Sequence, residues 1–464
     1  MRLGRLIALA VVVLGLGAYI YFYERHQPTT EERAERADKL LPDFQQDKAT
    51  RIEITNSHGR FELTKEKNDW KLVKPITDDA NSGAVTGLLS NLANLKAERT
   101  LAAKDVKRAD YGLEKPQLVA TVATEGGKTY TVKLGGELPL GNTRAAETSG
   151  DDVYIVSKWI ASDLDRDLSG WRSTDLVRLL SPDIASLTVR GPEGRVALAH
   201  AGGTWTITEP FPDLADRDRA EGLVGDLNSA KIKEFVDTPG DLAALGLAPS
   251  KLDITIVRKE GAPLQLAFGD EREQNKVKEL ACKRGDRVFW VEANAVSHAE
   301  TAPEGWRSKK LVALDTWNAD RLEIDEGKVK VALERKDGLW KANGAEVDSG
   351  AVSRRLEDLA DLEITSFGVP RPGGPELGKV TVKVESGSDV QATFYPGAAP
   401  TEAVASVPGR TGLMLVDGVK VRQLLADPAE LAKPKPTPTP VPKSTPAEKP
   451  AATPSSKTTP EARK

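Results

Sequence analysis

Apolar and polar residues alternate along three consecutive segments near the start of the chain. In each segment every second residue is apolar, as at Ile52 and Ile54, Phe61 and Leu63, and Trp70 and Leu72. This period of two is typical of a strand that buries one face. Short turn sequences such as Ser-His-Gly at 57–59 separate the segments. We therefore predict a meander of three half-buried strands.

The pattern changes to a helical one after these strands. Apolar residues then recur at intervals of three and four, at Val85, Leu88, Leu89, Leu92 and Leu95. Asp79 and Asn81 precede them as candidate N-caps. A second group of alternating segments follows at 118–124, 129–135 and 153–157. We predict an α+β fold, in which one amphipathic helix covers a small antiparallel sheet.

This pattern occurs three times along the chain. Six positions keep an interval of 135 residues: Trp70, Trp205 and Trp340, and Ile52, Leu187 and Leu322. The sequence Gly-Trp-Arg-Ser at 170–173 recurs at 305–308, whereas the third copy is shorter and has lost a Gly-Leu element. Because the repeat is too long for a solenoid, each copy should own a core. We predict repeat domains at 39–175, 176–310 and 311–432, the third of them divergent.

The N-terminal residues have the composition of a membrane anchor. An uncharged run fills 6–23 and follows Arg2 and Arg5. With its neighbours this run can cross about 30 Å of hydrocarbon as a helix, and the preceding basic residues keep its start in the cytoplasm. The alternative is a cleaved signal peptide, but aromatic residues stand where a cleavage site needs small ones. We predict a transmembrane signal anchor at 1–23 and a juxtamembrane spacer at 24–38.

Composition sets further limits on structure and partners. Residues 433–464 are rich in Pro, Lys and Thr and are predicted to form a disordered tail. Over the whole chain, 39% hydrophobic residues suffice for packed cores. The 65 basic and 69 acidic residues are interleaved without a basic stripe, so we expect no nucleic-acid partner.

The sequence contains no recognisable catalytic or metal-binding pattern. None of its four histidines has metal-ligand spacing, and Cys282 is the only cysteine, which excludes an intrachain disulfide. Asp163, Asp165 and Asp167 copy the first positions of a calcium loop but lack its glycine and final glutamate, so a solvated acidic turn is favoured. We predict no catalytic residue, no cofactor and no metal, in a protein that is not an enzyme.

The tryptophans divide into two groups with different expected roles. We expect Trp70, Trp205 and Trp340 in the core, because a residue kept in three otherwise diverged copies serves the fold that the copies share. A second group lies near the predicted domain junctions and consists of Trp171, Arg172, Trp306 and Arg307. We regard these four as candidate interaction residues, either in packing between domains or as an aromatic platform for a sugar or peptide.

Together these segments resemble a bacterial family, the domain of unknown function forty-three-forty. The resemblance rests on the N-terminal anchor, on Trp171-Arg172, and on the segments 51–55, 70–75, 111–116, 134–136 and 153–156. It covers about residues 39–432, closely in the first two copies and loosely in the third. The family has no established activity, so the resemblance implies class and location and transfers no catalytic residues.

The resemblance also implies partners. Family members are often encoded beside components of gliding-type ABC transporters. The resulting hypothesis is a non-enzymatic accessory or scaffold protein of an ABC transport or cell-envelope complex. It would span the bacterial inner membrane once, with a cytoplasmic N-terminus and periplasmic repeats. The alternative is a periplasmic glycan- or peptide-binding module that uses Trp171 and Trp306, and a third is a hydrolase with an unrecognised site.

Overall fold

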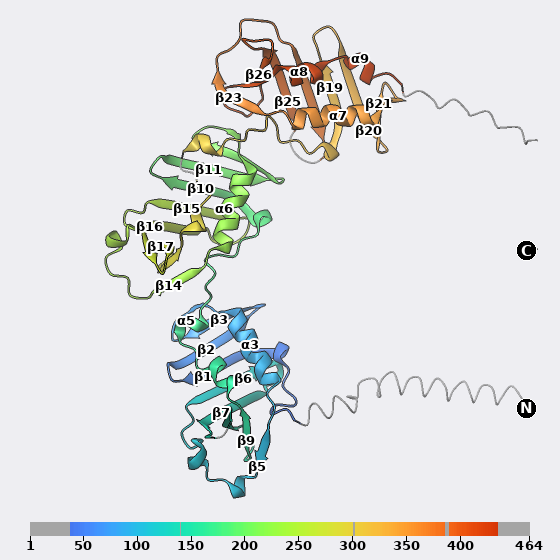
Figure 1. The fold of residues 1–464 in the computed structure, drawn as a ribbon. Coiled ribbons are helices and arrows are strands. Elements are labelled where there is room, and N and C mark those ends of the chain that lie inside the picture. Colours follow the sequence, from blue (N-terminus) through green and yellow to red (C-terminus); the bar gives the residue numbers. More distant parts are fainter. Residues whose placement is uncertain (1–37, 140, 300–301, 386–388, 435–464) are drawn as a thin grey trace, which may run out of the picture. The chain divides into compact units, whose positions relative to one another are not determined.

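The computed structural model describes residues 38–139, 141–299, 302–385 and 389–434, and it contains three antiparallel sheets (Figure 1). Each sheet has nine strands. Strand accounts for 45% of the described residues and helix for 23%. The predicted fold class, α+β with a transmembrane helix and three small sheet-plus-helix domains, is therefore wrong. Sheet dominates the described part of the chain.

The strands that the sequence pattern missed explain this error. β4 (Asp78–Asp79) has two residues and β5 (Arg99–Leu101) has three, which is too short for a period to be read. β8 (Thr143–Glu147) has the sequence Thr-Arg-Ala-Ala-Glu, in which apolar and polar residues do not alternate. These strands exist because neighbouring strands supply their ladder hydrogen bonds.

The membrane prediction concerns residues that the structure does not describe. No helix within the described ranges is both long and apolar enough to cross a membrane. The predicted anchor at 1–23, the spacer up to residue 37 and the tail from residue 435 lie outside the described residues. Each predicted repeat domain contains one whole sheet.

The three repeats share nine strands, a 3-10 turn before the first strand and a helix after the fourth, and they differ in their other short helices. The first comprises η2 (Gln46–Lys48), β1 (Ala49–Asn56), β2 (Gly59–Glu66), β3 (Asp69–Lys74), β4, α3 (Ser82–Ala93), β5, η3 (Ala103–Asp105), η4 (Arg108–Tyr111), β6 (Leu118–Thr124), η5 (Glu125–Gly127), β7 (Thr129–Glu137), β8, β9 (Val153–Ser157), α4 (Trp159–Leu164) and α5 (Leu168–Trp171). The second comprises η6 (Ser181–Asp183), β10 (Ile184–Gly191), β11 (Gly194–Ala201), β12 (Thr204–Glu209), β13 (Asp213–Leu214), α6 (Arg217–Ser229), β14 (Ile232–Val236), η7 (Leu242–Leu245), β15 (Leu252–Arg258), β16 (Leu264–Gln274), β17 (Val277–Arg284), β18 (Arg287–Glu292), η8 (Ala293–Val296) and η9 (Pro303–Trp306). The third comprises η10 (Thr316–Asn318), β19 (Ala319–Asp325), β20 (Lys330–Lys336), β21 (Leu339–Ala342), β22 (Ala345–Glu346), α7 (Ser349–Ala360), β23 (Ile364–Val369), β24 (Gly378–Val384), β25 (Val390–Pro396), β26 (Glu402–Ser406), β27 (Leu413–Asp417), α8 (Gly418–Leu425) and α9 (Pro428–Leu431).

One strand order is common to all three sheets. In the first it is β4-β3-β2-β1-β6-β7-β8-β9-β5, and the other two follow the same scheme. β4 and β5 are consecutive along the chain but lie at opposite edges, so α3 between them runs across one face of the sheet (Figure 1). The fifth strand of each sheet pairs with the ninth, which brings the residues after the helix beside the end of the repeat.

Helix α3 forms because the sequence specifies both its start and its buried face. The Asn81 side chain accepts a hydrogen bond from the Ala84 amide at 3.1 Å and caps the helix. Asp79, the other candidate cap, pairs with Lys71 instead. The buried residues of α3 are Ala84, Val85, Leu88, Leu89 and Leu92. They pack in one core with the inward-facing residues of β1–β3.

The six positions of the 135-residue repeat all lie in cores. All six are buried: Trp70, Trp205 and Trp340 on the third strand of each sheet, and Ile52, Leu187 and Leu322 on the first. Trp205 donates through its indole N–H to Glu221 at 2.8 Å and stacks on His200 with ring centroids 4.3 Å apart. A buried indole with a satisfied N–H suits a core role.

Contacts divide the chain into two compact units. Of the described residues, the first contains those within 38–179, 223–251 and 266–297. The second contains those within 180–222, 252–265 and 298–434. The clusters and the cavity described below each lie within one unit.

Two of the recurring motifs meet in space. Gly112, with a φ of +69°, ends η4, and the chain there runs directly over Gly135 of β7. A Cβ at Gly135 would lie 2.0 Å from the Tyr111 carbonyl oxygen, and one at Gly269 would lie 2.1 Å from that of Leu245. The third repeat lacks the covering Gly-Leu element and has Tyr395 at the position of Gly135. Glycine is therefore present only where a backbone segment crosses the strand.

We expect Gly135→Ala to destabilise the first repeat by about 1–3 kcal/mol, because its new methyl group meets backbone that cannot move aside easily. Denaturant unfolding of the full chain measures the loss. Gly87→Ala within α3 is the matched control, since a Cβ there meets nothing within 4 Å and alanine is the better helix former by about 1 kcal/mol. Equal stability of Gly135→Ala and the wild type would contradict the close approach.

Candidate functional site

The candidate interaction residues Trp171 and Trp306 are completely buried, with 0% exposure each. Trp171 ends α5 and lies near Phe61, with ring centroids 6.4 Å apart. Its backbone carbonyl accepts a hydrogen bond from the Asn81 amide at 2.9 Å, and that of Trp306 accepts one from Asp216 at 2.7 Å. Neither indole offers a surface for a sugar or a peptide in this conformation. Their roles here are to pack the end of a repeat and to place the arginine that follows.

Arg172 lies at the centre of a charged cluster in the first unit. Its Nε donates to Asp78 Oδ2 and its Nη1 to Asp237 Oδ1, both at 2.7 Å. The guanidinium carbon lies 3.7 Å from the centroid of the Phe235 ring. Arg287 donates to the other oxygen of Asp78 and, at 2.9 Å, to the Thr77 carbonyl. We call Asp78, Arg172, Phe235, Asp237 and Arg287 the first junction cluster.

The second unit contains an equivalent cluster. Arg307 Nε and Arg410 Nε donate to the two carboxylate oxygens of Asp213, each at 2.6 Å. The Arg307 guanidinium carbon lies 3.8 Å from the centroid of the Phe367 ring. Arg410 also donates to the carbonyls of Ser308 at 2.7 Å and Leu311 at 2.9 Å. We call Asp213, Arg307, Phe367 and Arg410 the second junction cluster.

Each cluster joins the end of one repeat to the next. The aspartate and the first arginine come from the upstream repeat, and the phenylalanine and the second arginine come from the downstream repeat. The phenylalanine lies on the fifth strand and the second arginine near the turn before the ninth. Since these two strands pair, they present both side chains from the same edge of the sheet.

The clusters are absent where no such junction exists among the described repeats. In the third repeat Ala345 pairs with Ala342 where Asp78 pairs with Leu72, and Ala432 follows α9 as Arg172 follows α5. In the first repeat Thr100 occupies the position of the phenylalanine. The aspartate and first arginine are therefore absent from the last described repeat, and the phenylalanine is absent from the first described repeat.

Burial makes the second cluster electrostatically demanding. The Asp213 side chain is 0% exposed, and both of its arginines are more than nine-tenths buried. Burial lowers the pKa of the Arg410 guanidinium, and the Asp213 carboxylate opposes this shift. A guanidinium nevertheless stays charged in proteins. The cluster thus has one buried anion that serves two buried cations, and carbonyl oxygens accept the remaining donors.

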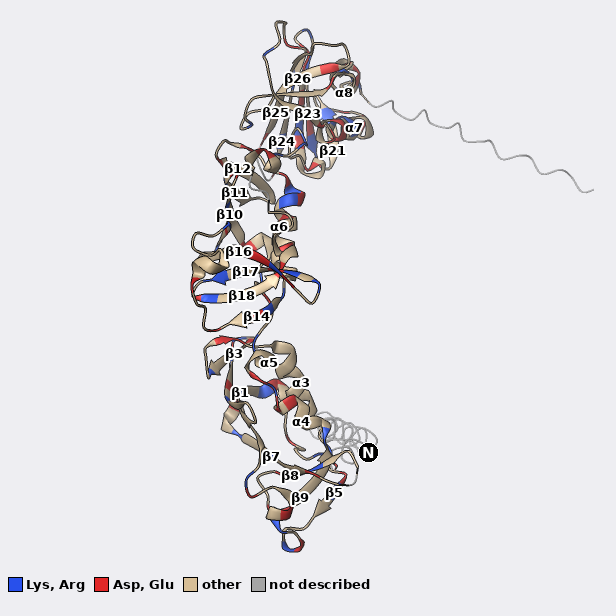
Figure 2. Cartoon of the chain, turned by 60° about the vertical axis from the view of Figure 1, so that its left-hand side comes forward, with Lys and Arg blue, Asp and Glu red and all other residues tan. Residues whose placement is uncertain are grey.

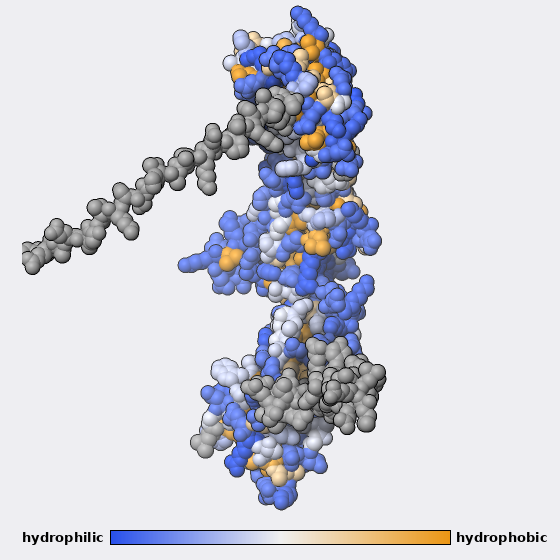
Figure 3. All heavy atoms as spheres, turned by 90° about the vertical axis from the view of Figure 1, so that its right-hand side faces the viewer, coloured by the Kyte–Doolittle hydropathy of each residue, from blue (hydrophilic) through white to orange (hydrophobic). Residues whose placement is uncertain are grey.

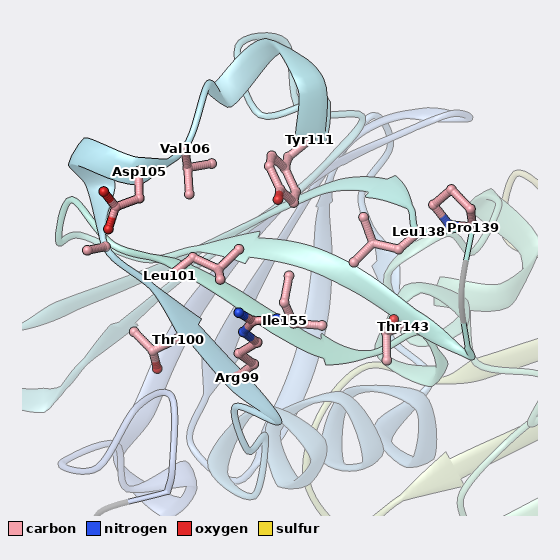
Figure 4. Close-up of a pocket in the computed structure, with 11 residues that line it drawn as sticks. Arg99, Thr100, Leu101, Asp105, Val106, Tyr111, Leu138, Pro139, Thr143 and Ile155 are labelled. Atoms are coloured by element: carbon pink, nitrogen blue, oxygen red, sulfur yellow. The ribbon is translucent and has the colours of Figure 1, made fainter.

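A cavity of about 690 Å³ opens in the first repeat, away from the first junction cluster. Strands β5 and β9 form its floor, and the segment from η3 to η4 closes its far side (Figure 4). Arg99 and Ile155 point into the space from the strands, and Tyr111 points toward them from η4. Its volume lies within the range of small-molecule sites.

One family model matches the chain twice, at residues 70–249 and 205–387, and carries the description Domain of unknown function (DUF4340). The two matches cover well over half of the chain. The chain belongs to this family. The resemblance predicted from the sequence is thereby confirmed, including its tandem copies. No curated protein matches the chain.

Each DUF4340 match begins at the repeated tryptophan and continues into the next repeat. The first match includes Asp78, Arg172 and Phe235, and the second includes Asp213, Arg307 and Phe367. Both stretches that match the family model therefore contain the aspartate, first arginine and phenylalanine of a junction.

The other sequence candidates of the DUF4340 chain do not form a shared site. Asp163 accepts from Asn91 at 2.6 Å, Asp165 from the Ser57 hydroxyl at 2.7 Å, and Asp167 from the Gly170 amide at 2.8 Å. No group of three or more His, Cys, Asp or Glu within the described residues could hold a metal ion. Cys282 is buried, and burial raises the pKa of its thiol to about 12.

Sequence reasoning named only one residue of each junction cluster as a candidate, Arg172 in the first and Arg307 in the second. Asp78 and Asp213 stand 135 residues apart, as the tryptophans do, so the repeat itself carried that signal. Arg287 and Arg410 do not keep the interval, and only the structure brings them to the aspartates.

Proposed function

We propose that this DUF4340 chain is a non-enzymatic accessory or scaffold protein of an ABC transport or cell-envelope complex. The observation that carries the proposal is the recurrence of the same Asp–Arg–Phe–Arg contact around a buried aspartate wherever one described repeat follows another. Buried ion pairs contribute little net stability but specify one geometry against alternatives. Ion pairs of this kind between successive repeats favour one defined contact between them.

The polarity of the described surface supports a protein-binding role. Basic and acidic residues are interspersed along the strands and loops (Figure 2). On the face in Figure 3, apolar residues form small groups separated by hydrophilic ones. Such a surface suits polar, reversible protein contacts better than a permanent hydrophobic interface.

The proposal places the repeats in the periplasm, tethered to the inner membrane by residues 1–23. Its support is the uncharged run at 6–23 behind Arg2 and Arg5. The ABC assignment rests on the family resemblance alone.

Affinity purification of the tagged full-length protein in mild detergent tests the proposal. We expect transporter membrane or auxiliary subunits to copurify in stoichiometric amounts, and to be lost from a variant that lacks residues 1–26. Light scattering on the same sample reports its mass. A monomeric, partnerless full-length protein would overturn the proposal, and so would equal recovery of the same subunits with the truncated variant.

A further inference from the structure

The cavity of the first repeat has a filled counterpart in the second repeat. There Arg272 donates through Nε to Glu279 at 2.8 Å and through Nη2 to Glu234 at 2.6 Å. Its guanidinium carbon lies 4.0 Å from the centroid of the Trp290 ring. An indole and a paired guanidinium thus occupy this end of the sheet.

Strand register identifies the equivalent residues in the first repeat. Arg99 pairs with Ile155 across β5 and β9, as Glu234 pairs with Trp290 across β14 and β18. Leu138 follows the Leu-Gly-Gly motif at the place where Arg272 follows Phe-Gly-Asp, and Thr143 pairs with Ser157 as Glu279 pairs with Glu292. All four of these first-repeat residues line the cavity: Arg99, Leu138, Thr143 and Ile155.

These four replacements change both the space and the charge. Isoleucine replaces tryptophan, so the volume of an aromatic ring is no longer filled from within. Two carboxylates and their arginine are replaced by Thr143, Leu138 and a single cation, Arg99. Within the described part of the chain Arg99 forms no ion pair. In the close-up, its guanidinium points toward the apolar side chains of Leu101 and Ile155 (Figure 4).

We propose that this cavity binds a small ligand with a flat aromatic body and one carboxylate. The body would lie against Leu101, Leu138 and Ile155, in the space that Trp290 fills in the second repeat. The carboxylate would accept from Arg99, whose planar guanidinium matches it in a charge-assisted pair. Asp105 at the rim disfavours ligands of high negative charge such as phosphates. This site is independent of the transporter assignment.

Titration calorimetry of the full-length protein in detergent tests the site with indole-3-acetate as the probe. We expect saturable one-to-one binding, weaker by about tenfold for the neutral indole-3-acetamide and absent for the cation tryptamine. Arg99→Gln should remove the preference for the acid over the amide. Arg195→Gln is the matched control, since this exposed arginine on β11 lies in the second repeat, and it should bind as the wild type does.

Ile155→Trp tests location, because it restores the indole of the second repeat and should abolish binding of all three probes. Isotope-labelled Ile155 provides a second readout that needs no variant, since its methyl signal should shift with indole-3-acetate. An absence of saturable binding up to about 10 mM would overturn the proposal, as that corresponds to less than about 3 kcal/mol. Binding that leaves the Ile155 signal unmoved, or that favours tryptamine, would overturn it equally.

Discussion

Replacement of Asp213 by alanine is expected to destabilise the second unit by about 3–5 kcal/mol. The carboxylate is the common acceptor of Arg307 and Arg410, which are both buried. Its removal leaves two largely buried guanidinium groups without a counter-ion, and this costs more than the intact cluster contributes. Asp213→Asn should show a smaller loss, because its amide oxygen still accepts one hydrogen bond.

Hydrogen exchange measures this loss at backbone amides of both repeats that the cluster joins. The opening free energy should fall at 213–216, which includes the edge strand β13 of the upstream repeat, and at 410–414 in the downstream repeat. Glu209→Ala on neighbouring β12 is the control, because its pair with Arg195 is exposed and such pairs are worth about 1 kcal/mol at most. An Asp213→Ala protein that exchanges like the Glu209→Ala protein would show that the cluster has no part in joining the repeats.

Trp171→Ala is expected to cost about 3–5 kcal/mol, because it opens a cavity in a core that encloses the whole indole. The change should also displace Arg172 from Asp78, so the effect should reach the partners of Arg172 in the following repeat, Phe235 and Asp237. Denaturant midpoints of the full chain, with exchange data to localise the loss, provide the measurement.

Trp159→Ala in the same repeat is the matched control. The Trp159 side chain is 70% exposed, so its removal should change stability by less than about 0.5 kcal/mol. Similar effects of the two substitutions would be incompatible with the difference in burial. A stable Trp171→Ala protein that merely lost a partner would restore the interpretation of Trp171 as an aromatic platform.

The junction clusters and the cavity both lie at the edge of the sheet that the fifth strand forms. In the second and third repeats the fifth-strand edge carries a phenylalanine that receives an arginine from the preceding repeat. In the first repeat Thr100 stands there, and beside it the cavity remains open. The same strand edge therefore has different surroundings in different repeats.

The sequence alone determined the repeat unit, its first three strands and its helix. Alternation at Ile52 and Ile54 and the spacing of Leu88 and Leu92 are local consequences of strand and helix geometry, so they can be read without knowing the fold. The interval of 135 residues then carried the same interpretation to the other two copies.

Only the tertiary structure decided the full sheet and both candidate sites. β5 has no pattern of its own and becomes a strand because β9 offers it hydrogen bonds. Arg287 meets Asp78 across 209 positions of sequence, and no periodicity records such a contact. The cavity of the first repeat exists because Ile155 stands where the second repeat has Trp290. This equivalence becomes evident only when the pairing of Ile155 with Arg99 is compared with that of Trp290 with Glu234. Long-range pairing and the volume left by absent side chains are properties of packing, and a local pattern does not contain them.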